Sequence, residues 1–184
     1  MAKVITFDGH DGVGKTSLIS STLERLTSSG YNSRGLRVVN NGHTSVNGQD
    51  MKTNIEIYLN AWKDTEDIIK NLHPNYEFLL VDRSHFSTYV LAQVFGIEIT
   101  QTKYERFLKP DLAIRVTLDE DERVRRLLSK KDRSPHDERT VDKDLILRAN
   151  RIYDTLRLTE LNNSGSLDQT SEKLYMLLMS LKGQ

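Results

Sequence analysis

The chain has 184 residues, the size of one ordinary domain, and its 26 basic and 26 acidic residues leave no net charge. The absence of cysteine excludes disulfides and thiolate sites, and the balanced charge argues against binding to nucleic acid polymers. Its apolar runs are too short for a membrane span or a signal peptide, so we expect a cytoplasmic protein with no membrane partner.

Short strands and helices alternate along the chain. Apolar runs predict strands at 3–7, 36–39, 78–81, 112–118 and 158–161. Helical spacing predicts helices over 15–28, 53–72, 84–95, 101–108, 119–126, 141–156 and 167–181. The order predicts an α/β fold, a five-stranded parallel sheet with helices on both faces, in a single domain over 1–184.

The acidic residues 119–122 stand at the start of one of these helices, and basic residues follow them. This order matches the helix dipole and favours a helix start over a metal site. In a sheet of this kind, ligands bind beyond the carboxyl ends of the strands. The turn after the first strand, Asp82 after the third strand and the polar loop over 40–52 all fall there.

The turn after the first strand carries the most specific signal. Gly9-His10-Asp11-Gly12-Val13-Gly14-Lys15-Thr16 matches G-x-x-x-x-G-K-[ST] between a strand and a helix. The glycines let backbone N–H groups converge on phosphate oxygens at the helix N-terminus. We therefore predict an ATP site in which Lys15 reaches the β- and γ-phosphates and Thr16 is a ligand of Mg²⁺. The predicted nucleotide contacts are Gly9, Asp11, Gly12, Val13, Gly14, Lys15, Thr16 and Ser17, while His10 only fills the loop.

Two charged residues follow the third strand. Asp82 is predicted to hold Mg²⁺ or its water, with a helix cap as the alternative. Arg83 is predicted to be catalytic and to contact a phosphate, with a surface ion pair as the alternative.

A polar segment over 129–140 is predicted to be a lid. Basic residues crowd it and could bring positive charge to a transferring phosphoryl group, although for any one of them a solvated surface position is the simpler interpretation. They are Arg126, Lys130, Lys131, Arg133 and Arg139. Arg133 is the one predicted to be catalytic.

These motifs together resemble the thymidylate kinase family of nucleoside monophosphate kinases, with the related deoxynucleoside kinases close behind. The segment 7–16 resembles the family's F-E-G-x-D-G-x-G-K-T, with Asp8 in place of the glutamate. Asp82-Arg83 resembles its D-R-Y or D-R-H motif, and Ser87 matches a later serine. The run 118–156, which ends in Arg148 and Tyr153, is similar to its strand, helix, lid and helix. The turn 161–167 is similar to the one near the adenine.

The resemblance spans nearly the whole chain and implies a homodimer, ATP with Mg²⁺, and an Asp11 that contacts the acceptor's sugar hydroxyl. Two departures concern the acceptor. The family's Arg-Glu-Pro segment after the second strand is replaced here by Val39-Asn40-Asn41-Gly42-His43-Thr44. Ser84 replaces the tyrosine after Asp-Arg, so Asp82-Arg83-Ser84 also resembles the E-R-S motif of deoxynucleoside kinases.

The leading hypothesis is transfer of the γ-phosphoryl group of ATP to a nucleoside monophosphate in nucleotide biosynthesis, with thymidylate as acceptor. A phosphate acceptor is already anionic and needs no strong base. The alternative is a kinase of a (deoxy)nucleoside or another small hydroxylated metabolite, with Asp11 or Asp50 as the base. A nucleotide-binding protein without turnover ranks third, since the N-K-x-D and D-x-x-G elements of a GTP switch are missing.

Overall fold

One parallel sheet forms the centre of the computed structural model, which describes residues 1–38, 50–99, 106–129 and 141–182. Its strands are β1 (Lys3–Asp8), β2 (Ser33–Arg37), β3 (Phe78–Asp82), β4 (Leu112–Thr117) and β5 (Thr159–Asn162). They lie in the order β2-β3-β1-β4-β5, and every neighbouring pair is parallel. The predicted α/β fold with a five-stranded parallel sheet is confirmed.

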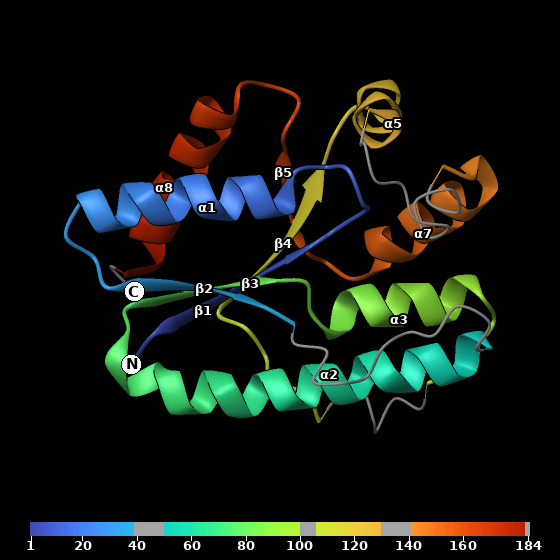
Figure 1. Ribbon diagram of the computed structural model, residues 1–184, viewed down its shortest axis with the longest axis horizontal. Helices are drawn as coiled ribbons and strands as arrows, with labels where there is room; N and C mark the ends of the chain where they lie inside the picture. Colours follow the sequence, from blue (N-terminus) through green and yellow to red (C-terminus); the bar gives the residue numbers. More distant parts are fainter. Residues whose placement is uncertain (39–49, 100–105, 130–140, 183–184) are drawn as a thin grey trace.

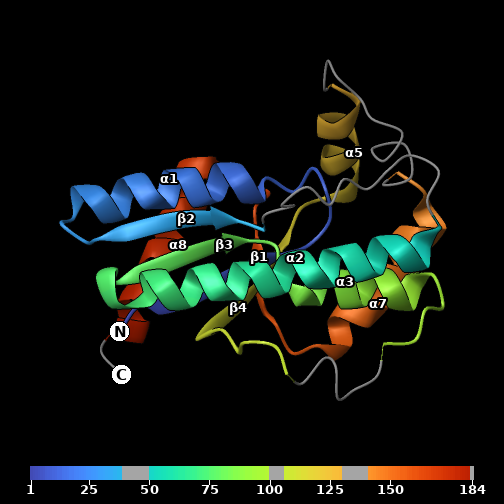
Figure 2. The same cartoon turned by 60° about the horizontal axis from the view of Figure 1, so that its bottom comes forward.

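Helices cover both faces of this sheet (Figure 1). On one face lie α1 (Lys15–Ser28) and α8 (Leu167–Lys182), which pack against each other. On the other face lie α2 (Met51–Leu72) and α3 (His85–Val94), with α7 (Lys143–Thr155) beside α3, and Figure 2 shows the same layers from below. The helix α5 (Glu120–Leu128) follows β4, and a short 3-10 helix that contains Pro74, η1 (His73–Asn75), follows the end of α2.

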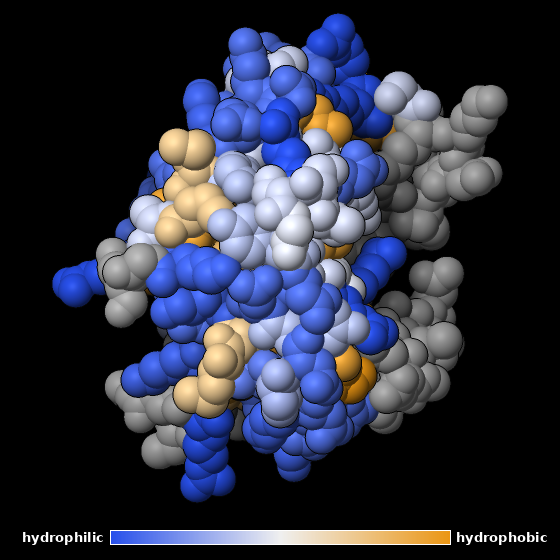
Figure 3. Space-filling model, turned by 90° about the vertical axis from the view of Figure 1, so that its left-hand side faces the viewer, coloured by the Kyte–Doolittle hydropathy of each residue, from blue (hydrophilic) through white to orange (hydrophobic). Residues whose placement is uncertain are grey.

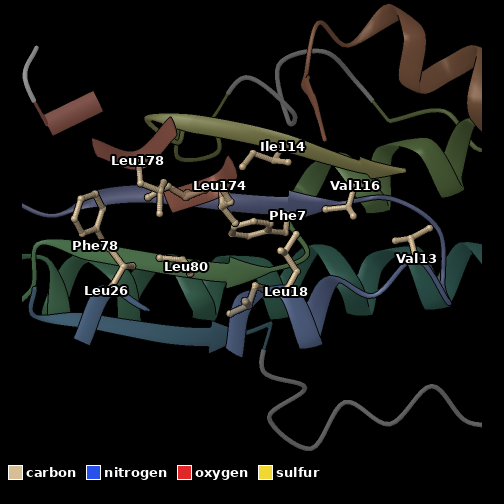
Figure 4. Close-up of a cluster of buried hydrophobic side chains, with 12 residues drawn as sticks. Phe7, Val13, Leu18, Leu26, Phe78, Leu80, Ile114, Val116, Leu174 and Leu178 are labelled. Carbon is tan, nitrogen blue, oxygen red and sulfur yellow. The ribbon is translucent and has the colours of Figure 1, made fainter. Parts of the chain in front are cut away.

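The two faces of the central strands bury two apolar clusters. One cluster joins the strands to α1 and α8, and its members include Ile5, Phe7, Leu18, Leu80, Leu174 and Leu178 (Figure 4). The other joins them to α2 and includes Val4, Trp62, Ile69, Leu79 and Val81. Because helices cover both faces, β3 is buried at every position.

The second strand begins three residues and ends two residues earlier than predicted. The prediction placed it at 36–39, where the residues are most apolar, but β2 covers Ser33–Arg37. At this sheet edge the backbone pairs with β3 from Ser33 onward. A Cβ on Gly35 would lie 2.8 Å from Leu23 Cδ1 of α1, so close helix packing rather than an apolar run marks the strand.

The helix predicted over 101–108 is wrong where the structure describes it. Residues 106–108 form a turn and a bend, and residues 100–105 lie outside the described residues. The N–H of Leu108 donates to Glu66 Oε1 of α2 at 2.6 Å, and Phe107 packs against the apolar clusters of α2. The other predicted helices are confirmed, and their ends differ by at most two residues.

Figure 3 views the molecule from the end opposite the turn that follows β1. The surface there is mostly hydrophilic, with small, separate hydrophobic patches. Among the described residues, no helix has both the length and the apolar character needed to cross a membrane.

Candidate functional site

The predicted phosphate loop, residues 9–16, lies at the carboxyl edge of the sheet between β1 and α1. Gly9 and Gly14 have positive φ angles of +126° and +89°. A Cβ on Gly9 would lie 2.4 Å from the carbonyl oxygen of Val116, and one on Gly14 would lie 2.6 Å from Asn163 Nδ2. Both positions therefore require glycine, because neighbouring backbone and side chains approach the loop so closely.

The N-terminus of α1 differs from the N-termini of the other helices that bear on the site. Gly14 occupies its N-cap position, no side chain caps the helix, and its first turn contains no acidic residue. By contrast, side chains cap α2, α3, α5 and α7, through Asp50, Ser84, Asp119 and Asp142. The uncapped N–H groups and the positive end of the α1 dipole form a binding position for phosphate oxygens.

Lys15 points back into the loop. Its Nζ donates to the carbonyl oxygens of Gly9 at 3.0 Å and His10 at 2.8 Å, and the side chain is buried. Burial lowers the pKa of the Lys15 ammonium, and the nearby Arg83 charge acts in the same direction, so that the pKa falls to about 7. An anionic ligand bound in the loop would therefore stabilise the charged form of Lys15.

The affinity for MgATP should depend on pH through Lys15. Below pH 7 the ammonium is already charged in the free protein, so the affinity should be nearly constant. Above pH 7 the free protein loses this proton, and binding must take it up again because the phosphates raise the pKa of Lys15. We therefore expect affinity to fall by up to about tenfold per pH unit above 7. Titration calorimetry in buffers of different ionisation enthalpy checks this; binding at pH 8 without proton uptake would contradict it.

The two predicted Mg²⁺ ligands meet at the edge of the loop. The hydroxyl of Thr16 donates to Asp82 Oδ2 at 2.5 Å, between the first turn of α1 and the end of β3. A hydroxyl and a carboxylate oxygen are hard ligands that suit Mg²⁺, which commonly takes one or two protein oxygens together with substrate phosphates. The residues present therefore fit the cation, with Thr16 and Asp82 as its ligands beside the phosphate position.

Asp8 holds the start of α3 against the end of β1. Its buried carboxylate accepts the N–H of Ser84 at 3.1 Å and the hydroxyl of Ser84 at 2.7 Å. It also accepts the N–H and hydroxyl of Ser87, at 3.1 Å and 2.5 Å. Burial raises the pKa of Asp8, and these hydrogen bonds oppose that rise. Asp8 thus ties the first turn of α3 to the end of β1, next to the phosphate loop.

Arg83 is fixed between β3 and α3 in a conformation that a non-glycine residue rarely adopts. Its φ is +76°, and its N–H donates to the Phe7 carbonyl at 2.9 Å. Its guanidinium forms an ion pair with the Asp11 carboxylate. The structure therefore brings together Asp11 and Arg83, which the sequence analysis assigned to different contacts, and leaves both about one-third exposed at the site, 29% and 35%.

Sequence reasoning missed two side chains that support the loop. The Arg123 guanidinium of α5, 1% exposed, binds both Glu120 oxygens and donates to the Asp11 carbonyl at 2.9 Å. Asn163, after β5, donates to the Val13 carbonyl at 2.8 Å, while its buried Oδ1 has no hydrogen-bond partner among the described residues. The only signal for Asn163 was that the turn 161–167 resembles the family's turn near the adenine. For Arg123, the acidic-then-basic order after Asp119 predicted only the helix that bears it.

Arg37 was also missed, because the second strand was predicted too late. It ends β2 in register with Asp82, so the two side chains lie on the same face of the sheet. That face is the α1 side, since Gly35, two residues earlier, faces Leu23 and Ile19 of α1. Arg37 is exposed. The edge that carries the predicted metal ligands therefore carries an exposed arginine as well.

Several predicted site residues lie outside the described residues. These are Lys130, Lys131, Arg139 and the predicted catalytic residue Arg133, together with most of the lid at 129–140 and of the acceptor loop at 40–52. Arg126 is described, but it lies within α5 rather than in a loop, and its Nε donates to Glu122 at 2.9 Å. The acidic run before it starts α5 as predicted, with Asp119 as its cap.

The family model described as thymidylate kinase matches the chain over residues 7–174, from the end of β1 into α8. The match thus includes the phosphate loop, Asp82, Arg83 and the α7 helix. No curated protein matches the chain.

Proposed function

Because the chain belongs to the thymidylate kinase family, whose members are nucleotide kinases that use ATP with Mg²⁺, we propose that it phosphorylates thymidylate, giving thymidine diphosphate and ADP. Phosphoryl transfer to a nucleoside monophosphate follows from membership of the family. Thymidylate as the acceptor, a homodimeric state, a cytoplasmic location and one kinase domain over 1–184 are the predictions that go beyond it.

One observation favours a phosphate acceptor over a hydroxyl acceptor: the aspartates at the site are engaged. Asp8 binds Ser84 and Ser87, and Asp82 binds Thr16. Asp11 pairs with Arg83, so its carboxylate is already occupied by a cation.

Asp50, the other candidate base for a hydroxyl acceptor, is engaged as well. It caps α2 through the N–H and hydroxyl of Thr53, at 2.9 Å and 2.8 Å, and the first of these bonds lowers its pKa. A phosphate oxygen needs no base to attack, so these pairings support the monophosphate reaction.

In the proposed reaction, an oxygen of the acceptor phosphate attacks the γ-phosphorus of ATP. The bond between that phosphorus and the β–γ bridging oxygen breaks, and ADP leaves with the electron pair. Loop N–H groups and Lys15 bind the donor phosphates and stabilise the charge that develops on them. When bound, Mg²⁺ neutralises charge on the β- and γ-phosphates, and Thr16 and Asp82 would hold it.

Two arginines are proposed to bind the acceptor phosphate. Arg83 follows Asp82, one of the predicted Mg²⁺ ligands, and its guanidinium is paired with the Asp11 carboxylate. An acceptor phosphate can compete with Asp11 for this guanidinium. Arg37, in register with Asp82 at the end of β2, supplies positive charge near the place where the Arg-Glu-Pro arginine is missing. The resemblance implies that Asp11 contacts the acceptor's sugar hydroxyl. Arg133 remains the predicted lid arginine.

The proposal predicts ADP release from MgATP that depends on a nucleoside monophosphate. A coupled assay with monophosphates, nucleosides and no acceptor should give the highest kcat/KM with thymidylate. In the same assay, Arg37→Ala should raise the KM for the monophosphate by about tenfold or more, the value of one charge-assisted contact, and leave the KM for ATP unchanged. Arg34→Ala, which removes the other exposed arginine of β2, three residues before Arg37, is the matched control and should change neither KM. Turnover with nucleosides alone would favour the hydroxyl-acceptor alternative.

A further inference from the structure

The helix α7 holds the first two residues of the phosphate loop. The backbone N–H of Gly9 donates to the hydroxyl of Tyr153, with an N···O distance of 3.2 Å, in a fully buried contact. The Tyr153 ring meets the His10 ring edge to face, with centroids 5.9 Å apart. Tyr153 is 5% exposed, and burial raises the pKa of its hydroxyl to about 12, so it stays neutral at every physiological pH.

A second α7 residue binds the loop through a side chain. Asn150 Oδ1 lies 2.9 Å from His10 Nε2 and also accepts from Arg115 Nη2 of β4 at 2.8 Å. An amide oxygen only accepts hydrogen bonds, so His10 donates from Nε2, and its ring is fixed in that tautomer or in the protonated form. His10 is therefore an attachment point of the loop and more than the filler that the sequence suggested.

The same two loop residues present their carbonyl oxygens to Lys15, at 3.0 Å and 2.8 Å. Their other groups, the N–H of Gly9 and the ring of His10, are held by α7. The orientation of the Gly9–His10 peptide units thus links α7 to the Lys15 ammonium. We propose that Tyr153 and Asn150 are positioning residues that act through Gly9 and His10 to place Lys15 for the donor phosphates.

This inference rests on ATP as the donor and not on the identity of the acceptor. Binding of MgATP can therefore test it without any turnover. If no acceptor stimulated ADP release while the protein still bound MgATP, the proposed kinase function would be rejected. The roles of Tyr153 and Asn150 in MgATP binding could still be tested.

The first variant, Tyr153→Phe, removes the hydroxyl and keeps the ring against His10 and beneath the Arg115 guanidinium, 5.1 Å from the ring centroid. Leaving the buried Gly9 N–H unpaired should lower the affinity for MgATP by about tenfold. The KM for the acceptor should not change. Thermal unfolding and circular dichroism establish that the variant is folded.

Asn150 provides the second variant pair. Asn150→Leu removes the hydrogen-bond acceptor at similar volume and should also weaken MgATP binding. Asn150→Asp keeps an acceptor for His10 and Arg115 and should retain the affinity for MgATP. The matched control is Asp154→Asn on the same helix, which weakens a 2.6 Å bond to Arg115 without touching the loop. It should alter the melting temperature without altering MgATP affinity. Equal losses of MgATP affinity in Asp154→Asn and Asn150→Leu would mean that any destabilisation of α7 weakens binding, and this result would overturn the proposal.

A double-mutant cycle tests whether Lys15 carries the effect. If it does, Tyr153→Phe should weaken MgATP binding about tenfold in the natural chain and hardly at all in a Lys15→Met background. Additive losses in the cycle would show that Tyr153 acts independently of Lys15. Additivity, or an unchanged affinity in both Tyr153→Phe and Asn150→Leu, rejects the positioning role.

Discussion

Replacing Lys15 by methionine should lower kcat for phosphoryl transfer by about 10²-fold or more, because its ammonium is a buried cation held within the phosphate loop. The same change should leave the free energy of unfolding unchanged or raise it. Burial already depresses the pKa of Lys15 to about 7, so the folded protein bears a cost for this charge that methionine does not bear. Loss of activity together with retained or improved stability is the signature of a residue kept for function.

Steady-state kinetics and urea unfolding measure the two effects of Lys15→Met. Lys63→Met is the matched control, because Lys63 is an exposed lysine on α2 away from the loop. It should change neither kcat nor stability appreciably. Activity of Lys15→Met within a few-fold of the natural chain would remove Lys15 from the proposed machinery.

Asp8→Ala should produce the largest loss of stability among the site variants, about 2–4 kcal/mol by urea unfolding. The substitution leaves the buried N–H group of Ser84 and the partly buried N–H group of Ser87 without their acceptor. It should also lower kcat/KM, because Arg83 lies between β3 and the first turn of α3, which Asp8 holds in place. A loss of stability and activity together distinguishes Asp8 from Lys15.

The matched control for Asp8 is Asp119→Ala. Asp119 also accepts an N–H from the first turn of a helix, Glu122 of α5 at 3.1 Å, but it is exposed. Loss of such a cap costs about 1 kcal/mol. If Asp8→Ala cost no more than Asp119→Ala, the buried carboxylate would not be the organising contact described here.

The phosphate loop could be predicted because its signal is local. Glycines, a lysine and a threonine within eight consecutive positions, with a strand before and a helix after, define both the backbone and the ligand. The strand β3 was equally clear, since burial on both faces makes it apolar throughout. The edge strand β2 was misplaced because its residues are largely polar, and only its pairing with β3 defines it.

The supports of the loop could not be predicted from local patterns. Tyr153, Arg123 and Asn163 contact the loop across sequence separations of 144, 112 and 150 residues. A single sequence contains no signal for such pairings, which depend on how α5, α7 and the end of β5 pack at the sheet edge. The direction of Lys15, onto the loop's own carbonyls, likewise follows from tertiary burial and not from the motif.

We propose that the phosphate of thymidylate is the acceptor. The most direct measurement is the identity of the product, by ³¹P NMR and chromatography, after incubation of the protein with MgATP and either thymidylate or thymidine. We expect thymidine diphosphate, with one ADP for each molecule formed, from thymidylate and no product from thymidine. Thymidine monophosphate formed from thymidine, with thymidylate left unchanged, would contradict it.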